Sequence, residues 1–295
     1  MHVYNPVNMM EKHESYIITG PTASGKSGFA HKLAMDVDGV IINCDSVQIY
    51  RGIENISASP FANREISDAI DGVPYRLFSI LPLSEQISVS DYLEMARHEY
   101  SAAISANRVP IFVGGTGYYV NAIINGLSPM PDVSIENRRR ARQMVAEDID
   151  AVRKMLPDDF TATDPQRVAR AWEVFLETGR HLTQWQKLPR IGAITPTPYR
   201  ILINPEMSEL RPRIAARIPK MLAGGAMDEA RAIIAAGWDT RRAIGAAQLC
   251  ARVRGEISDT ECIRDWITKT NQYAKRQRTW FRTQFVADTE INYVP

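Results

Sequence analysis

The chain has 295 residues and a formal net charge of +1 at pH 7, with 45% hydrophobic and 23% charged residues. These values are typical of a folded globular protein, and they exclude disordered, collagen-like and fibrous chains. The length suits two domains, or one large α/β domain with an insertion.

The cysteines and the N-terminal segment indicate a protein of the reducing cytoplasm. Cys44, Cys250 and Cys262 form no CxxC pair and are odd in number, which argues against a disulfide framework or a structural zinc site. No basic segment followed by an apolar one marks a secretory signal. The longest uncharged stretch, 109–131, contains four Gly and three Pro, so we expect no membrane helix there.

Short apolar runs and helical patterns alternate in the first part of the chain. The apolar runs predict buried strands at 16–19, 40–44 and 109–113. Helical patterns predict one helix after Ser27 and another over roughly 90–106. Strands that alternate with helices are typical of an α/β fold, in which helices cover both faces of a parallel sheet.

The pattern changes after Gly126. Charged helical segments at roughly 134–156 and 165–178 predict a helical insertion, after which a strand returns at 199–203. Residues from about 208 to 285 are again helical, with breaks at Gly224-Gly225, Gly237 and Gly255. We therefore divide the chain into a core segment (1–127), a helical insertion (128–190), and a return to the core with C-terminal helices (191–295).

The strongest motif is the loop from Gly20 to Ser27, with the sequence GPTASGKS. It matches G-x-x-x-x-G-K-[ST] and stands between a predicted strand and a predicted helix, as a P-loop requires. Its backbone N–H groups and the positive end of the helix would surround a phosphate. Lys26 would add charge on the terminal phosphate, and the Ser27 hydroxyl could bind Mg²⁺. The loop predicts a polyphosphate with Mg²⁺, without distinguishing ATP from a diphosphate.

Asp45 follows the second predicted strand, at the sheet edge where open α/β proteins bind their ligands. A carboxylate beside a phosphate site can hold a metal ion, or it can act as the general base for a nucleophile. The pair Asp45-Ser46 could also simply cap a helix. The residue alone leaves these three roles open.

A glycine-rich segment, Gly114-Gly115-Thr116-Gly117, ends the third predicted strand. Three glycines in four positions permit close backbone approach to a ligand, and Thr116 would offer a hydroxyl there. A tight turn from strand to helix explains the same pattern. Because three strand ends carry polar or glycine-rich residues, a common site at this edge is favoured.

The C-terminal helical segment is locally basic, with six cations and one acidic residue between 264 and 282. Aromatic residues recur in it every seven positions from Trp266. One interpretation is an amphipathic helix with a solvated cationic face. The other is that Lys275, Arg278 and Arg282 present their charge to a phosphate backbone. The five histidines show no metal-ligand spacing, so no metal besides Mg²⁺ is expected.

Six segments of the chain together resemble the tRNA isopentenyltransferase (tRNA dimethylallyltransferase) family. They occur in family order and cover most of the chain from about 16 to 285. The matching segments are GPTASGKS (20–27), DSVQIYRG (45–52), GVPYRLF (72–78), VGGTGYYVNAIINGLSP (113–129), DPQRVARAWEVFLETG (164–179) and YAKRQRTWFR (273–282).

This resemblance implies a P-loop-kinase-like parallel sheet flanked by helices, with a helical insertion domain. It implies transfer of a dimethylallyl group from dimethylallyl diphosphate to N6 of the adenosine at position 37 of tRNA, with release of diphosphate. Asp45 would take the N6 proton, Thr116 would help to bind or activate the reacting groups, and Lys26 with Mg²⁺ would stabilise the leaving diphosphate. The diphosphate site would comprise Gly20, Pro21, Thr22, Ala23, Ser24, Gly25, Lys26 and Ser27, with either Arg213 or Arg217.

The second partner implied by the resemblance is the tRNA anticodon stem-loop, whose target base must be extruded to reach a buried donor. The implied contacts are Asp45, Ser46, Val47 and Gln48 in the core, Arg138, Gln166, Arg167, Val168, Ala169 and Arg170 in the insertion, and Lys275, Arg276, Arg278 and Arg282 near the C-terminus. The chain departs from many relatives at Gly245-Ala246-Ala247-Gln248, where an aromatic residue and a cation are missing.

Two other functions use the same motifs. A relative that prenylates free adenine nucleotides would not need the DPQR and KRQ segments, which this chain keeps. A P-loop kinase for a small metabolite would bind and hydrolyse ATP. We expect a monomer, because the sequence has no long apolar heptad seam.

Overall fold

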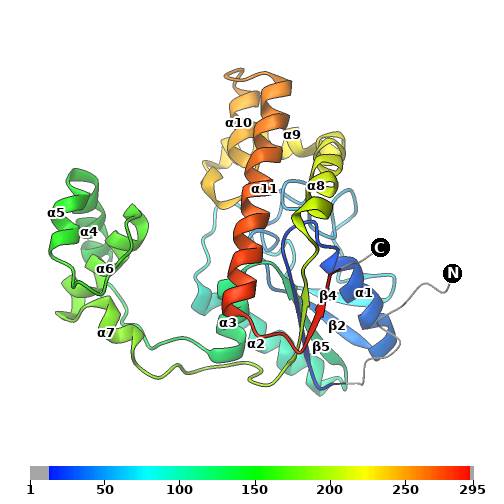
Figure 1. Cartoon of the computed structure of the whole chain (residues 1–295), viewed down its shortest axis with the longest axis horizontal. Helices are drawn as coiled ribbons and strands as arrows, with labels where there is room; N and C mark the ends of the chain where they lie inside the picture. Colours follow the sequence, from blue (N-terminus) through cyan, green and yellow to red (C-terminus); the bar gives the residue numbers. More distant parts are fainter. Residues whose placement is uncertain (1–12, 293–295) are drawn as a thin grey trace. The chain divides into compact units, whose positions relative to one another are not determined.

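The structure, a computed structural model, describes residues 13–292. The chain forms two compact units (Figure 1). Among the described residues, the core unit consists of 13–124 together with 194–292, and the insertion unit consists of 125–193. The expected boundaries of the insertion, 128 and 190, lie just inside the second range.

The core unit is built on a seven-stranded sheet with the order β3-β4-β2-β5-β1-β6-β7. Every neighbouring pair is parallel except β3 and β4, which form an antiparallel edge. This arrangement confirms the predicted α/β class. The strands are β1 (Tyr16–Thr19), β2 (Gly39–Asn43), β3 (Ala69–Ile70), β4 (Val73–Arg76), β5 (Val109–Gly114), β6 (Tyr199–Ile203) and β7 (Thr289–Ile291).

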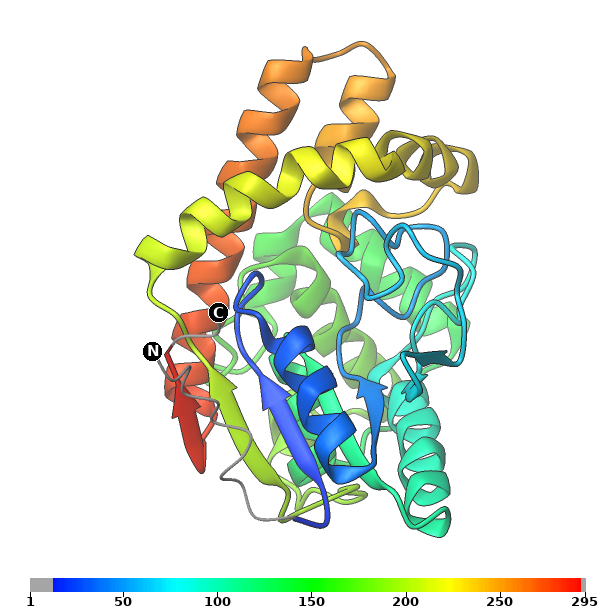
Figure 2. The same cartoon turned by 90° about the vertical axis from the view of Figure 1, so that its right-hand side faces the viewer.

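Helices cover both faces of the sheet, which explains why its central strands β1, β2 and β5 are buried at every position. One face is covered by α1 (Lys26–Val37) (Figure 2). Its Phe29 and Leu33 pack into a cluster with alternate strand residues. On the other face, Tyr100 of α2 (Val89–Ser105) stacks against Phe112, with ring centroids 6.2 Å apart. The strands predicted at 16–19, 40–44, 109–113 and 199–203 are all present within one residue of the expected bounds.

Three short strands were not anticipated. In β4 only Val73 and Tyr75 are buried, and Pro74 removes a backbone donor, so the segment lacks a continuous apolar run. The strands β3 and β7 contain two and three residues, which is too short for a periodic signal.

The helices after β6 form a layer above the carboxyl edge of the sheet (Figures 1 and 2). The longest of them, α11, begins at a capping box in which Ser258 and Glu261 satisfy each other's backbone N–H groups. Breaks occur near Gly225, Gly237 and Gly255, as predicted. The elements are α8 (Met207–Met221), η2 (Leu222–Ala226), α9 (Met227–Ala236), η3 (Thr240–Arg242), α10 (Ala246–Val253) and α11 (Asp259–Gln284).

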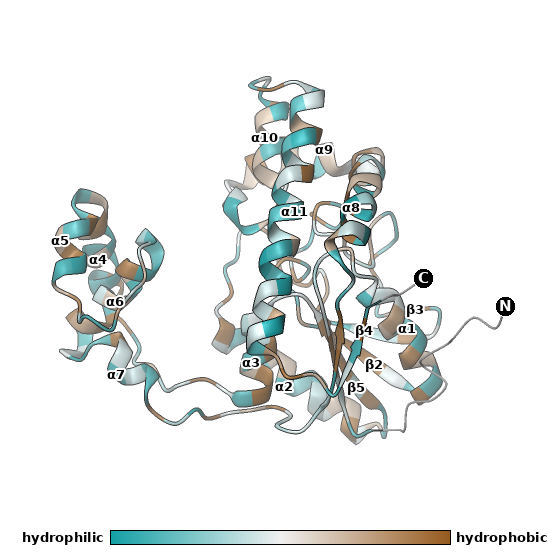
Figure 3. Ribbon diagram, in the orientation of Figure 1, coloured by the Kyte–Doolittle hydropathy of each residue, from teal (hydrophilic) through white to brown (hydrophobic). Residues whose placement is uncertain are grey.

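Hydrophilic side chains occur along much of α11 (Figure 3). The buried residues of α11, among them Trp266, Gln277 and Phe281, form the face that packs on α8 and α10 and on the loops at the edge of the sheet.

Between residues 13 and 292, no helix is both long and apolar enough to span a membrane.

The insertion unit is a small helical bundle with its own core, formed largely by α4 and α6. The segment predicted to be helical at roughly 134–156 is helical, but it consists of two helices because Asp148 interrupts it. Its carboxylate accepts from the N–H of Ala151 at 2.9 Å and so starts a new helix. The helix predicted at 165–178 is confirmed. The elements are α3 (Gly117–Asn125), which leads into the unit from the core, and α4 (Ile135–Glu147), α5 (Ile149–Lys154), α6 (Pro165–Thr178) and α7 (Leu182–Gln186).

Candidate active site

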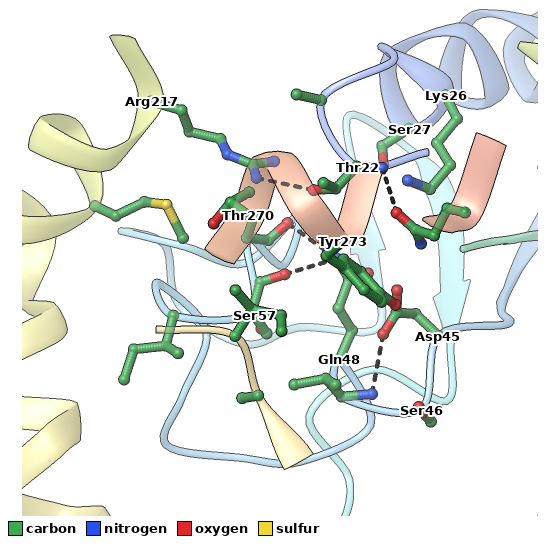
Figure 4. Close-up of a pocket in the computed structure, with 18 of the residues that line it drawn as sticks. Thr22, Lys26, Ser27, Asp45, Ser46, Gln48, Ser57, Arg217, Thr270 and Tyr273 are labelled. Carbon is green, nitrogen blue, oxygen red and sulfur yellow. Dashed lines mark hydrogen bonds between the residues drawn. The ribbon is translucent and has the colours of Figure 1, made fainter. Parts of the chain in front are cut away.

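The carboxyl ends of β1, β2 and β5 meet at one edge of the sheet. The loops that follow β1 and β2 border a cavity of about 760 Å³ there (Figure 4). Cations outnumber carboxylates in its lining: the charged residues are Lys26, Asp45, Arg213, Arg217, Arg241, Arg242 and Arg276. A cavity of this size and charge suits a polyanionic ligand.

The P-loop occupies one wall of this cavity. Ala23 and Gly25 have φ values of 63° and 91°, which curve the backbone around the space in front of α1. The Lys26 ammonium donates to the carbonyl of Pro21 at 3.3 Å. Burial lowers the pKa of Lys26 to about 8, although the charge of Asp45 opposes this shift. A half-buried cation whose charged form is disfavoured by desolvation gains from an anionic ligand.

Arg217 reaches the same loop from α8. Its guanidinium donates to the Thr22 hydroxyl at 2.8 Å, and burial lowers its pKa to about 10 (Figure 4). Its Nε is buried and has no hydrogen-bond partner among residues 13–292. Arg213 also lines the cavity, but its guanidinium lies 3.9 Å from the Glu209 carboxylate. The geometry therefore brings Arg217, rather than Arg213, into contact with the P-loop.

The position of Asp45 is fixed by its neighbours. The Asn43 side chain accepts from the N–H of Asp45 at 2.8 Å and donates to its carbonyl at 3.0 Å. One carboxylate oxygen of Asp45 accepts from the N–H of Val47 at 3.0 Å. The other oxygen is oriented toward Gly115, and the side chain lines the cavity.

Thr116 links the loops after β2 and β5. Its hydroxyl accepts from the N–H of Ser46 at 3.0 Å and can donate to the Ser46 hydroxyl at 3.2 Å. It lines a smaller cavity of about 250 Å³, and Gln277 lines both this cavity and the main one.

The glycines around Thr116 serve the packing of the protein itself. A Cβ on Gly115 would stand 2.5 Å from Nε2 of Gln277, and one on Gly117 would stand 2.5 Å from the ring of Trp280. The glycines were expected to let the backbone approach a ligand. At Gly115 and Gly117 they instead let the loop approach side chains of α11.

Gln277 is a site residue that sequence reasoning did not single out. Its Oε1 accepts from the N–H of Thr22 at 2.8 Å, and its Nε2 donates to the carbonyl of Gly115 at 2.9 Å. One buried side chain thus joins the P-loop to the loop after β5. Gln277 lies in the segment YAKRQRTWFR, whose charge pattern indicated a role only for the cations. Tyr273, one turn earlier, borders both cavities.

The basic residues of α11 are not equivalent. Lys275, Arg276 and Arg282 are exposed. Arg278 departs from the expected solvated face, because its guanidinium donates to both carboxylate oxygens of Glu206, at 2.7 and 2.9 Å. These bonds lower the pKa of Glu206 and neutralise the charge of Arg278.

This difference gives a testable expectation for binding of a nucleic acid. Replacing Lys275 and Arg282 by Ala should weaken binding of tRNA and reduce the slope of log K against log salt concentration by about 0.9 for each lost phosphate contact. Replacing Arg278 should leave the slope unchanged. Salt titrations of tRNA binding check this, with Lys32→Ala, an exposed cation on α1, as the control. An unchanged slope in the double variant would show that Lys275 and Arg282 are solvent-exposed cations that do not contact tRNA phosphates.

The remaining predicted tRNA contacts lie in the insertion unit. Arg138, Gln166 and Arg167 are exposed on α4 and α6. Arg170 lies 3.4 Å from the carboxylate of Glu173. Val168 and Ala169 are buried in the core of the unit, so the expectation that they contact tRNA does not hold for their side chains.

The fold and the site define a P-loop-containing α/β protein with a cationic cavity at the carboxyl edge of its sheet. The chain belongs to the IPP transferase family, whose model matches residues 48–284. Two curated relatives are called tRNA dimethylallyltransferase. The one from Paramagnetospirillum magneticum is 36% identical over 283 residues, which are 92% of this chain and 88% of the relative. The one from Gluconacetobacter diazotrophicus is 38% identical over 277 residues, 90% and 82% of the two chains.

Solved structures resemble the whole chain. The full-length tRNA isopentenylpyrophosphate transferase from Bacillus halodurans has a TM-score of 0.67 and 29% identity, covering 96% of this chain and 92% of its own. A eukaryotic dimethylallyltransferase acting on tRNA has a TM-score of 0.74 at 22% identity and covers 91% of this chain and 70% of its own, which supports the fold.

Proposed function

We propose that this protein transfers a dimethylallyl group from dimethylallyl diphosphate to N6 of the adenosine at position 37 of tRNA, releasing diphosphate. The observation that carries the proposal is the shared cavity of Lys26, Arg217 and Asp45, in a chain of the IPP transferase family. The cations suit a diphosphate leaving group, and the carboxylate suits the removal of a proton. Because tRNA is the acceptor, we place the reaction in the cytoplasm.

In the proposed reaction, the N6 lone pair attacks C1 of the donor as the C1–O bond breaks, and the bonding electrons leave with the diphosphate. The P-loop amides, Lys26 and Arg217 stabilise the negative charge that develops on the leaving group. Asp45 accepts the N6 proton through the carboxylate oxygen that Val47 does not hold. Thr116 fixes the loop beside Asp45 through its bonds to Ser46.

Magnesium fits this site through the chemistry of its donors. Ser27 lines the cavity at the start of α1, and its hydroxyl would supply one oxygen ligand beside oxygens of the substrate and water. The part of the chain described here, 13–292, holds no cluster of three His, Cys, Asp or Glu side chains suited to a metal, so the ion would depend on the substrate. When bound, it would neutralise charge on the diphosphate.

A transfer assay with labelled dimethylallyl diphosphate and Mg²⁺ tests the proposal. The acceptors are an unmodified tRNA with adenosines after its anticodon, the same tRNA with the target adenosine replaced, and free AMP. We expect label on the first tRNA alone. Label on AMP would indicate an adenine-nucleotide dimethylallyltransferase. No label anywhere, with ATP consumed in the presence of small metabolites, would indicate a kinase.

The lowered pKa of Lys26 predicts how activity depends on pH. The charged form binds the diphosphate, and in the free enzyme it is lost as the pH rises through about 8. A bound diphosphate raises this pKa again. We therefore expect kcat/KM for the donor to fall above pH 8 while kcat changes less. Initial rates at varied donor concentration between pH 6.5 and roughly 9.5 check this; a flat kcat/KM would contradict it.

A further inference from the structure

The loop between Gly52 and Pro60 forms the wall of the main cavity opposite the P-loop through Ile56, Ser57 and Ala58. Two of its carbonyls hold the side chain of Gln48. The Nε2 of Gln48 donates to the carbonyl of Ser57 at 3.1 Å and to that of Ala58 at 3.0 Å (Figure 4). Both hydrogens of the amide are thereby used within the protein.

These two bonds determine which end of the Gln48 amide is available in the cavity. An amide that rotated by 180° would place its oxygen against two carbonyl oxygens, which cannot donate. The orientation is therefore fixed as long as both carbonyls stay in place. The group that Gln48 can offer to a ligand is its Oε1, which only accepts hydrogen bonds.

The loop is held in place from α9 by a single carboxylate. Glu229 accepts from the N–H of Asn55 at 2.7 Å, from its side-chain amide at 2.9 Å, and from the N–H of Ile56 at 2.8 Å. Hydrogen bonds to a charged acceptor are stronger than neutral ones, and three of them converge here. Glu229 itself does not line either cavity around the site.

The loop also packs closely against Gly224, at the junction of α8 and α9. A Cβ on Gly224 would stand 2.4 Å from Oδ1 of Asn55 and 2.5 Å from Oδ1 of Asn63. Within the loop, Ala58 has a φ of +54°, a conformation that a non-glycine residue adopts only when its surroundings impose it. Bonds inside the loop also hold this segment: the N–H groups of Ser57 and Ala58 donate to the carbonyls of Ile53 and Asn55 at 2.9 and 3.0 Å. The bonds of Glu229 to Asn55 and Ile56 fix the start of the same turn from outside the loop.

We propose that Glu229 is a positioning residue for recognition of the target base: through the backbone of residues 55–58, it keeps Oε1 of Gln48 as a fixed acceptor for the exocyclic amino group of adenine. The proposal rests on the proposed function. Adenine presents N–H donors at this position, whereas guanine and hypoxanthine present an oxygen. A fixed acceptor disfavours that oxygen, while an amide free to rotate could donate to it.

Binding of anticodon stem-loops to Glu229→Gln tests the proposal. A glutamine has the same shape but offers one acceptor in place of two, and its NH₂ group opposes the N–H donors of the loop. The stem-loops carry adenosine or inosine at the target position. We expect the wild-type protein to prefer adenosine by at least about tenfold. In the variant this ratio should fall severalfold, while the affinity for inorganic diphosphate stays unchanged. Glu229→Asp, which keeps the charge, should restore part of the ratio.

The control is Asp228→Asn on the same helix, whose carboxylate is exposed and pairs with Arg231; it should retain the wild-type ratio. An unchanged ratio in Glu229→Gln, or a ratio in Glu229→Asp no higher than in Glu229→Gln, would overturn the positioning role. If Glu229→Gln does not fold, Gly224→Ala displaces Asn55 while keeping the carboxylate, and it should lower the ratio too. A wild-type protein that transfers to tRNA without preferring adenosine would overturn this inference alone. One that transfers nothing would overturn the proposed function with it.

Discussion

Asp45→Asn is expected to reduce the rate of dimethylallyl transfer by about 10²- to 10⁴-fold, the usual contribution of a general base. Asparagine is nearly isosteric, and its Oδ1 can still accept from the N–H of Val47, so the loop should keep its shape. It cannot accept the N6 proton. The affinity for tRNA should therefore stay within about twofold, since only one hydrogen-bond acceptor changes to an amide.

Single-turnover rates with enzyme in excess, measured beside tRNA binding, separate these two effects. Asp36→Asn, a matched change at an exposed carboxylate on α1, is the control and should retain full activity. Near-normal turnover in Asp45→Asn would show that the carboxylate acts only in shaping the loop. Loss of tRNA binding in parallel with activity would assign it to substrate binding instead.

The sequence predicted the parts of the site that lie at strand ends. Apolar runs place β1, β2 and β5 in a parallel sheet, and the polar residues that follow them must then meet at one edge. Lys26, Asp45 and Thr116 could be found in this way, because each stands within three residues of a strand or inside a motif with fixed spacing.

Residues supplied by the helical layer could not be chosen from the sequence. Arg213 and Arg217 are four positions apart and so share one face of α8. Only the packing of α8 on the core brings Arg217 to Thr22 while Arg213 stays near Glu209. The periodicity of a helix predicts which face is buried, but it does not predict which turn of that face reaches a particular loop.

The same reason applies to contacts across long stretches of chain. Gln277 binds the N–H of Thr22, and Glu229 binds the backbone of Asn55. No local sequence pattern predicts either hydrogen bond, because the donor in each is a backbone N–H more than 170 residues from the accepting side chain. Both bonds connect the helical layer to a loop of the sheet, so the cavity depends on residues that sequence motifs alone do not reveal.

Lys26→Met is expected to lower kcat/KM for dimethylallyl diphosphate by about 10²- to 10³-fold, as removal of one group that stabilises a developing anion does. The same change should stabilise the protein. Burial lowers the pKa of Lys26, which means that the folded state disfavours the charged ammonium. Methionine has a similar length and no charge to desolvate, so the melting temperature of the free protein should rise by about 1–3 °C.

The size of this stabilisation depends on pH. A lysine whose pKa is lower in the folded state than in the unfolded state destabilises the fold while it is charged, and this cost diminishes as the pH rises from about 8 toward 10.5. The advantage of Lys26→Met should therefore be larger at pH 7 than at pH 10. Thermal melts at both values, with Lys32→Met on the exposed side of α1 as the control, measure it. A variant that loses both activity and stability would contradict this. It would show that the main role of the ammonium is to stabilise the P-loop through its bond to the Pro21 carbonyl.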